Sequence, residues 1–281
     1  MTSQSNSLAP ILCAPLLRKV DAELIDLLCS LTPREWDLQT IAPLWKVRDV
    51  AAHLLDTALR KLSAVRDSCF VEAADIRSPE DLIAFVNRLN REGVAVYRRL
   101  SPPVLIEMMS LACEQSADFH ESLDPFAPAV FAVSWVGEQA SLNWFDTARE
   151  LTERWHHQQQ IRLATDRPGL MTPELYYPVL DCFLRGLPHA CRDLDAPPGT
   201  TILVEISGDC GGQWFLSKAP GAWVLVKEKP GGFASRVTIP QALAWRIFTK
   251  GIDRGSARAQ VQIEGNQELG EKVLHLTAIV G

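Results

Sequence analysis

The sequence predicts a mixed fold, a helical bundle over the first two thirds of the chain followed by a small α+β domain. From residue 10 to about residue 186, apolar residues recur at three- and four-residue spacing, which is typical of helices with one buried stripe. Beyond residue 200, short alternating apolar runs are separated by glycine and proline, as in strands joined by hairpins. We therefore expect domains at 1–186 and 201–281, joined by a Pro-rich linker at 187–200.

The helices of the predicted bundle have recognisable ends. The first carries an apolar stripe over residues 16–31 and ends before Pro33, because proline disfavours helix in the residue before it. The second begins near Trp45 and continues to about residue 62. The third begins after Ser78, with proline at its first position, and continues to about residue 100.

Three further helices complete the bundle, which resembles a four-helix type with one long connection. We expect a helix over 104–111, an irregular crossover at 117–140, a long helix over 142–164 capped by Ser141, and a helix over 173–186.

The second domain is predicted to combine five strands with two helices. The strands are expected at 201–206, 213–217, 223–227, 236–239 and 259–263, and the helices at 240–250 and 267–276.

Composition indicates a packed, acidic protein. Of the 281 residues, 47% are hydrophobic and 22% are charged, which argues against a disordered chain. The formal net charge is −6 and there is no basic block, so we expect no nucleic-acid partner. No apolar run approaches the roughly 18 residues needed to span a bilayer, so we expect no membrane partner.

Cysteine usage predicts a cytoplasmic location. The seven cysteines are an odd number and no two form a CxxC pair, which favours reduced thiols over a secreted disulfide framework. The apolar segment 8–17 has no preceding basic residue and no cleavage site, so no signal peptide is expected.

The sharpest chemical signal is a carboxylate and an imidazole on the long helix. Glu153 and His157 are four residues apart, so both lie on one face and could place an oxygen and a nitrogen on the same metal ion. His156 competes with His157 as the ligand, because a spacing of three is also feasible. The alternative interpretation is an ordinary surface pair.

His53 is the leading candidate for a third ligand. It lies on the second helix beside apolar Val50 and Leu54, where a titratable ring needs a hydrogen-bond partner or a metal. Two histidines, one glutamate and an open fourth position are typical of catalytic zinc. The alternative is a core histidine satisfied by a neighbouring group.

Two segments resemble a known family. Residues 45–54, WKVRDVAAHL, are similar to the WxVRDVxAHL segment of the mycothiol-dependent maleylpyruvate isomerase family, one of the DinB-like metal-binding helical bundles. The Glu153–His157 pair is similar to that family's second metal segment, and the C-terminal region resembles its small sterol-carrier-like domain.

The resemblance implies a site and an activity. His53, Glu153 and His157 would bind a divalent metal, with zinc as the first choice. The thiol of mycothiol would be the nucleophile, because a coordinating thiol is deprotonated at neutral pH. In maleylpyruvate, the thiolate adds to the double bond, the adduct rotates, and elimination gives the trans isomer.

The chain departs from the family pattern at two places. Residues 41–44 read Ile-Ala-Pro-Leu, where members often have Cys-Pro-Gly. Gln158, Gln159 and Gln160 follow His157, where many members have an acidic residue. The group that orients the imidazole of His157 is therefore not identified by the sequence.

Other charged residues are weaker candidates. Asp146 and Glu150 share the helix face of Glu153 and His157. Either could act as a hydrogen-bond acceptor or a general base, and the alternative is that both belong to a solvated acidic face. Arg236, Arg246 and Arg258 are candidates for binding a substrate carboxylate, since arginine does so with two parallel hydrogen bonds. His120 and His189 are expected in loops, with structural or solvated roles.

The sequence thus predicts a metal-dependent thiol transferase or thiol-assisted isomerase that acts on a small electrophile with mycothiol or a similar low-molecular-weight thiol. Two alternatives remain open. One is a metal-dependent hydrolase that uses water at the same site. The other is a non-enzymatic protein that binds an apolar ligand and holds a structural metal.

Overall fold

The computed structural model describes residues 8–70, 74–228 and 231–279. Contacts divide these residues into two compact units. The bundle unit comprises residues 13–70, 74–130 and 142–170, and the sheet unit comprises 8–12, 131–141, 171–228 and 231–279. The domain limits expected above stay a prediction, and the compact units divide the chain near residue 170 instead of residue 186.

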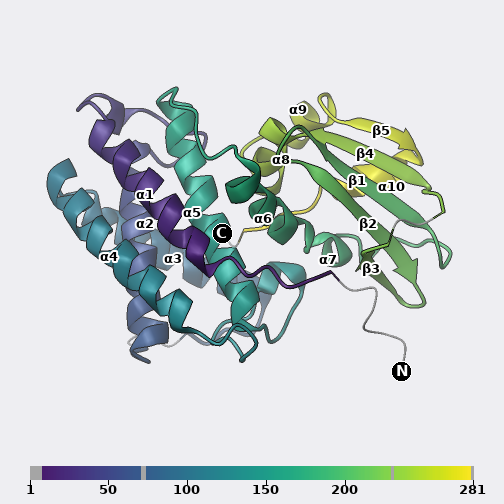
Figure 1. Cartoon of the computed structure of the whole chain (residues 1–281), viewed down its shortest axis with the longest axis horizontal. Coiled ribbons are helices and arrows are strands. Elements are labelled where there is room, and N and C mark those ends of the chain that lie inside the picture. The colour runs from purple at the N-terminus through teal and green to yellow at the C-terminus, as the bar shows by residue number, and fades with distance from the viewer. Residues whose placement is uncertain (1–7, 71–73, 229–230, 280–281) are drawn as a thin grey trace. The chain divides into compact units, whose positions relative to one another are not determined.

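The bundle unit is built from five long helices (Figure 1). Helix α1 packs against α4 and α5, and α2 packs against α3, α4 and α5. A short 3-10 helix, η1, precedes α2, and a π-helical turn, η2, continues from its end. The bounds are α1 Ala14–Ser30, η1 Glu35–Asp37, α2 Val47–Lys61, η2 Leu62–Arg66, α3 Pro79–Tyr97, α4 Pro102–Ser122 and α5 Asn143–Ala164.

The predicted helices of the bundle are present, with two corrections. Helix α4 continues to Ser122, through part of the segment predicted to be irregular, because Ala117 and His120 keep its buried face against the bundle. Helix α5 starts at Asn143 with Leu142 at its N-cap. Ser141 does not cap it, and its hydroxyl accepts a hydrogen bond from the backbone N–H of Val133 instead.

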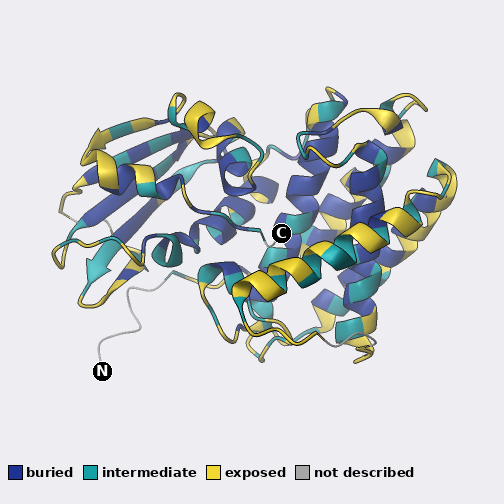
Figure 2. Ribbon diagram, turned by 180° about the vertical axis from the view of Figure 1, so that it is seen from behind, coloured by how far each residue is buried: buried dark blue, intermediate teal, exposed yellow. Residues whose placement is uncertain are grey.

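An apolar core explains why these helices associate. Leucines of α1, the inner face of α2 and Leu105 and Met109 of α4 form one cluster of buried side chains, which includes Ile161 of α5. Figure 2 shows the buried inner sides of the helices in dark blue. Fully burying a Leu or Met side chain contributes roughly 1.5–3 kcal/mol, so this cluster holds α2 and α5 together.

The sheet unit contains a five-stranded mixed sheet of order β3-β2-β1-β4-β5. Strand β1 pairs in parallel with β4 and antiparallel with β2, and the other two pairs are antiparallel. The bounds are β1 Thr201–Ser207, β2 Gly212–Ala219, β3 Ala222–Val226, β4 Ser235–Pro240 and β5 Gln262–Gly265.

Helices accompany the sheet within this unit. The hydroxyl of Tyr176, on α6, donates to the carbonyl of Gln241 and accepts from the N–H of Trp245, both on α8, which explains why α6 groups with the sheet and not with the bundle. The bounds are η3 Ser134–Val136, α6 Pro173–Leu184, α7 Leu187–Ala190, α8 Gln241–Phe248, α9 Arg254–Arg258 and α10 Gln267–Val273.

The predicted fold class is confirmed, a helical bundle followed by a small α+β domain, with local corrections in the second part. The segment 187–200, predicted as a linker, begins with the short helix α7. The last strand lies at 262–265 and not at 259–263, because α9 and the turn after it occupy 254–260. Across the described ranges, none of the helices is long and apolar enough to cross a membrane.

Candidate metal centre

The start of α2 places His53. The side chain of Asp49 accepts a hydrogen bond from the backbone N–H of Lys46, at 3.0 Å. Asp49 is the third residue of the helix, and its side chain thereby satisfies the backbone N–H of the N-cap residue Lys46, which has no partner within the helix. One turn further, Val50 and Leu54 are buried in the core and bring His53 to the inner face with them.

The loop before α2 places an aromatic ring over the site. The side-chain amide of Gln39 donates to the carbonyls of Ala42 and Trp45, each at 2.9 Å, and holds the loop closed. The ring centroid of Trp45 lies 4.6 Å from that of His53 and 5.7 Å from that of His157. The loop that departs from the family pattern is therefore an ordered turn that positions Trp45.

The three predicted ligands converge although they come from two helices. His53 on α2 and Glu153 and His157 on α5 each offer a ligand atom, and these atoms all lie within 4.8 Å of one another. The rings of His53 and His157 meet edge to face, with centroids 4.6 Å apart. Nε2 of His157 lies 3.5 Å from Oε2 of Glu153. All three residues belong to the bundle unit.

Burial leaves one side of this group accessible. His53 and His157 are buried, whereas the side chain of Glu153 is 27% exposed. Nδ1 of His53 is buried and has no hydrogen-bond partner among the described residues. A buried polar atom without a partner is costly. The donor set therefore fits a divalent metal such as zinc, which imidazole nitrogens and carboxylate oxygens commonly bind.

Electrostatics favour the ligand forms of these side chains. Burial, reinforced by the neighbouring His157, lowers the pKa of His53 well below its usual value, so the ring is neutral. Burial opposes ionisation of Glu153, yet its contact with His157 and the nearby Arg149 outweigh burial and hold the pKa of Glu153 below the ordinary range. His53 is therefore neutral and Glu153 ionised, which are the forms in which these side chains bind a metal.

The contacts of His156 and Gln160 bear on two points that the sequence left open, the choice between His156 and His157 as ligand and the group that orients His157. Nδ1 of His156 lies 2.8 Å from the carbonyl of Thr152, so this ring is engaged with its own helix. Burial, together with His157, lowers the pKa of His156 to about 3. Oε1 of Gln160 lies 2.9 Å from Nδ1 of His157, which identifies Gln160 as the group that orients this imidazole.

Asp146 and Glu150 are not a solvated acidic face. Asp146 forms a buried ion pair with Lys61 of α2 at 2.5 Å and a second with Arg149 at 2.8 Å. Glu150 pairs with Arg154 at 3.2 Å. Both carboxylates are therefore engaged in the interior and are not free to act as a general base.

These pairs belong to a larger ionic network. Arg154 also pairs with Asp21 of α1 and donates to the hydroxyl of Ser116 on α4 at 2.6 Å. Among the described residues, the network balances three cations against three anions. We call the following six residues the ionic network: Asp21, Lys61, Asp146, Arg149, Glu150 and Arg154. Burial disfavours the ionised form of Asp146, but Arg149 and Lys61 more than compensate and lower its pKa.

The other candidate residues are placed elsewhere. His120 is a buried residue of α4, not a loop residue, and its Nδ1 lies 3.0 Å from the hydroxyl of Thr147. His189 lies in α7, which replaces part of the expected loop. In the sheet unit, Arg236 pairs with Glu205 at 2.5 Å and Arg258 with Glu271 at 3.0 Å. Nε of Arg246 is buried and unpartnered within the described residues.

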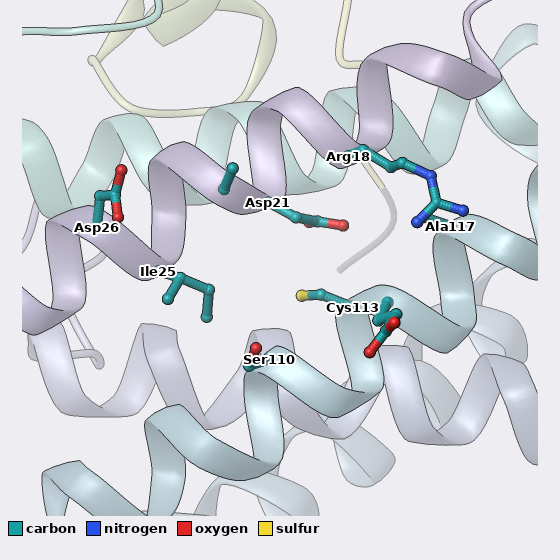
Figure 3. Close-up of a pocket in the computed structure, with 9 residues that line it drawn as sticks. Arg18, Asp21, Ile25, Asp26, Ser110, Cys113 and Ala117 are labelled. Atoms are coloured by element: carbon teal, nitrogen blue, oxygen red, sulfur yellow. The ribbon is translucent and has the colours of Figure 1, made fainter.

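A groove of about 310 Å³ lies between α1 and α4, apart from the three converging ligands. Figure 3 shows Asp21 and Cys113 projecting into the space between these helices, with Arg18 at one end. Burial raises the pKa of Asp21 to about 6 and keeps the Cys113 thiol protonated by raising its pKa. The groove thus offers no reactive thiolate to the candidate centre.

Fold and site together define a class of protein, a helical bundle with a three-donor candidate metal centre, followed by a small mixed-sheet unit. The family model of the mycothiol maleylpyruvate isomerase N-terminal domain matches residues 17–162, which is more than half of the chain. The protein therefore belongs to this family. The match spans α1 to α5 and includes His53, Glu153 and His157.

Solved structures extend the similarity beyond the bundle. A histidine-to-alanine mutant of mycothiol-dependent maleylpyruvate isomerase is similar over 89% of this chain and 91% of that chain, with a TM-score of 0.51 and 14% identity. Another structure of mycothiol-dependent maleylpyruvate isomerase has the same coverage, a TM-score of 0.49 and 13% identity. Among curated proteins, none matches this sequence. At these identities, the likeness to the first structure shows a shared fold.

Sequence reasoning missed the positions around the three ligands. Trp45 lies within the motif, but only the folded loop brings its ring onto His53 and His157. Gln160 could have been found, because a residue three positions after His157 lies on the same helix face. The ionic network could not, since Lys61 and Asp146 are 85 residues apart.

Proposed function

We propose that this protein is a metal-dependent thiol transferase or thiol-assisted isomerase that uses mycothiol or a similar low-molecular-weight thiol on a small electrophilic substrate. The observation that carries the proposal is the convergence of three ligand atoms from α2 and α5 within 4.8 Å. Membership of the mycothiol maleylpyruvate isomerase family supports the choice of thiol.

His53, Glu153 and His157 would hold the metal, for which zinc is the first choice. The unpartnered Nδ1 of His53 supports this assignment, because a metal or another donor is needed to offset its burial. When bound, a divalent ion lowers the pKa of a coordinating thiol, so that the thiolate is present near neutral pH.

The charges of the donor set favour an anionic partner. Two neutral imidazoles and one carboxylate compensate only one of the two charges of a divalent ion, and a thiolate would compensate the other. An enzyme that binds water at the same position needs the same donor set. The distinction between thiol chemistry and hydrolysis therefore depends on experiment.

Burial suggests where the thiol would approach. Trp45 covers the rings of His53 and His157 and shields them from water. Glu153 is the ligand with the largest exposed fraction, 27% of its side chain, so the accessible side of the centre lies beside its carboxylate. We infer that the small thiol enters there.

Metal analysis followed by thermal unfolding with mycothiol, bacillithiol and glutathione tests the proposal. We expect stoichiometric metal and stabilisation by one of these thiols only in the metal-loaded protein. His157→Gln should lose both. His156→Gln is the matched control, because that ring is engaged with the carbonyl of Thr152, and it should retain both.

Three outcomes would contradict the proposal. One is purified protein that takes up no stoichiometric metal. Another is an equal thiol effect with and without metal. A third is turnover of ester or amide substrates that does not depend on thiol, which would favour the metal-dependent hydrolase.

A further inference from the structure

The contact between Gln160 and His157 lies at the end of α5 that carries the candidate centre. Oε1 of Gln160 is 2.9 Å from Nδ1 of His157, and both side chains are buried. The two residues are three positions apart on the helix, so helix geometry itself brings them together. A buried amide that is hydrogen-bonded to one ring nitrogen influences whether the other nitrogen carries the proton or a free lone pair.

The ring nitrogens of a neutral histidine share a single proton. When the amide oxygen of Gln160 accepts a hydrogen bond from Nδ1, the proton resides on Nδ1 and Nε2 carries a free lone pair. Nε2 is the nitrogen that lies 3.5 Å from Oε2 of Glu153, on the side of the candidate centre. This arrangement prepares Nε2 to bind a metal.

An amide differs from a carboxylate because it can also donate. After a half-turn, the NH₂ group of Gln160 would face Nδ1 and donate to it. The single ring proton would then reside on Nε2 and point to the carboxylate of Glu153. An ionised carboxylate in place of the amide could only accept, and would support the first arrangement alone.

We infer that Gln160 is a positioning residue that sets the tautomer of His157, and that its amide allows the centre to relax to a second hydrogen-bonded state when no metal is bound. This inference rests on the proposed metal centre. The second state competes with metal binding, so the amide makes metal binding weaker and more readily reversible than a carboxylate would. The departure from an acidic residue at this point of the sequence thereby has a physical consequence.

Nitrogen-15 spectra of the His157 ring test the tautomer directly. They are recorded at about pH 8, where imidazoles are neutral, with and without Zn²⁺. In the metal-free protein we expect a resolved contribution with the proton on Nε2, which Zn²⁺ converts to protonation on Nδ1 alone. Gln160→Glu should show protonation on Nδ1 alone in both states. An unaltered protein with Nδ1 protonated throughout would overturn the inference.

Zn²⁺ affinity, measured by competition with a chelator, is the second readout. Removing a group that orients a ligand histidine costs about 10- to 100-fold in metal affinity, so Gln160→Met should weaken binding by that amount. Gln160→Glu should bind Zn²⁺ more tightly than the unaltered protein. The matched control is Gln159→Met, since Gln159 is equally buried but donates to the carbonyl of Gly169.

The two readouts separate the inference from the proposed function. If the unaltered protein binds no Zn²⁺, the proposed function fails, and the metal-free ring spectra still decide whether Gln160 sets the tautomer. If Zn²⁺ binds but Gln160→Met leaves both tautomer and affinity unchanged, the inference fails and the proposed function stands. Weaker binding by Gln160→Glu would also overturn it.

Discussion

Two polar regions share the interior of the bundle, and they differ in whether their charges are satisfied. In the ionic network, Glu150 and Arg154 of α5 pair with each other. Asp146 pairs with Lys61 of α2, and Arg154 also pairs with Asp21 of α1. In the candidate metal centre, whose residues alternate with those of the network along α5, the ligand atoms of Glu153 and His157 converge with that of His53. Every charged side chain of the ionic network has an oppositely charged partner, although Oδ1 of Asp21 lacks a hydrogen bond within the described parts of the chain. In the candidate metal centre, the buried Nδ1 of His53 has no hydrogen-bond partner among the described residues.

The comparison shows that burial of charged residues alone does not identify a functional site. The ionic network has more charged side chains than the centre, yet its cations and anions balance, and it is explained as a structural element. The feature that points to a ligand is an unpartnered buried nitrogen on a histidine that converges with two other potential metal ligands. Removing one partner should therefore damage the two regions in different ways.

The largest effect on stability is expected in the ionic network. Lys61→Met leaves Asp146 buried with one of its partners missing, which should lower the free energy of unfolding by about 3–5 kcal/mol. Denaturant unfolding of the metal-free protein measures this. Arg88→Met, which removes an exposed pair with Glu92, is the control and should cost less than about 0.5 kcal/mol. Equal losses in the two variants would refute the assignment.

The metal centre should respond mainly through its ligand. Zn²⁺ at 100 times its dissociation constant should raise the free energy of unfolding by about 2.7 kcal/mol, and His53→Ala should abolish that gain. Unfolding of each protein with Zn²⁺ and with a chelator provides the measurement. A gain that survives in His53→Ala would show that the metal binds elsewhere.

The smallest effect is a pH dependence at the edge of the ionic network. Burial lowers the pKa of His120 to about 4, below the usual 6.5. The unfolded chain thus takes up a proton between these values while the folded protein does not, so stability falls as pH is lowered through this window. Between pH 6.5 and 5, His120 should account for about 2 kcal/mol of the loss.

His120→Gln tests this dependence. The variant should show a shallower fall in unfolding free energy between pH 6.5 and 5, as measured by urea unfolding. His275→Gln, at an exposed histidine, should retain more of the slope of the unaltered protein. An unchanged slope in His120→Gln would assign the pH dependence to other groups.

Much of the fold could be predicted because its signals are local. The stripe of leucines gives α1, Ser78 and Pro79 mark the start of α3, and alternating runs give β1 to β4. Helix ends are harder to predict from the sequence where tertiary contacts determine them. Ser141 has the chemistry of a cap, yet its hydroxyl binds Val133, which the local sequence does not reveal.

The candidate ligands could be chosen from the sequence because Glu153 and His157 share one helix face at a fixed spacing and His53 interrupts an apolar one. Their convergence required folding, since it depends on how α2 packs against α5. The same holds for Asp146 and Glu150, for which the sequence left a solvated face as one of several alternatives. The structure shows them in buried ion pairs with Lys61 and Arg154.

The sequence by itself determined the fold class, the spacing of the ligands on α5 and the acidic, apolar-rich composition, because these depend on residues near one another along the chain. Only the tertiary structure decided that Trp45 covers two imidazoles, that Gln160 contacts His157, and that three cations balance three anions in the interior. The physical reason is that hydrogen bonds and ion pairs act over a few ångströms, and only packing of the helices brings those atoms within that range.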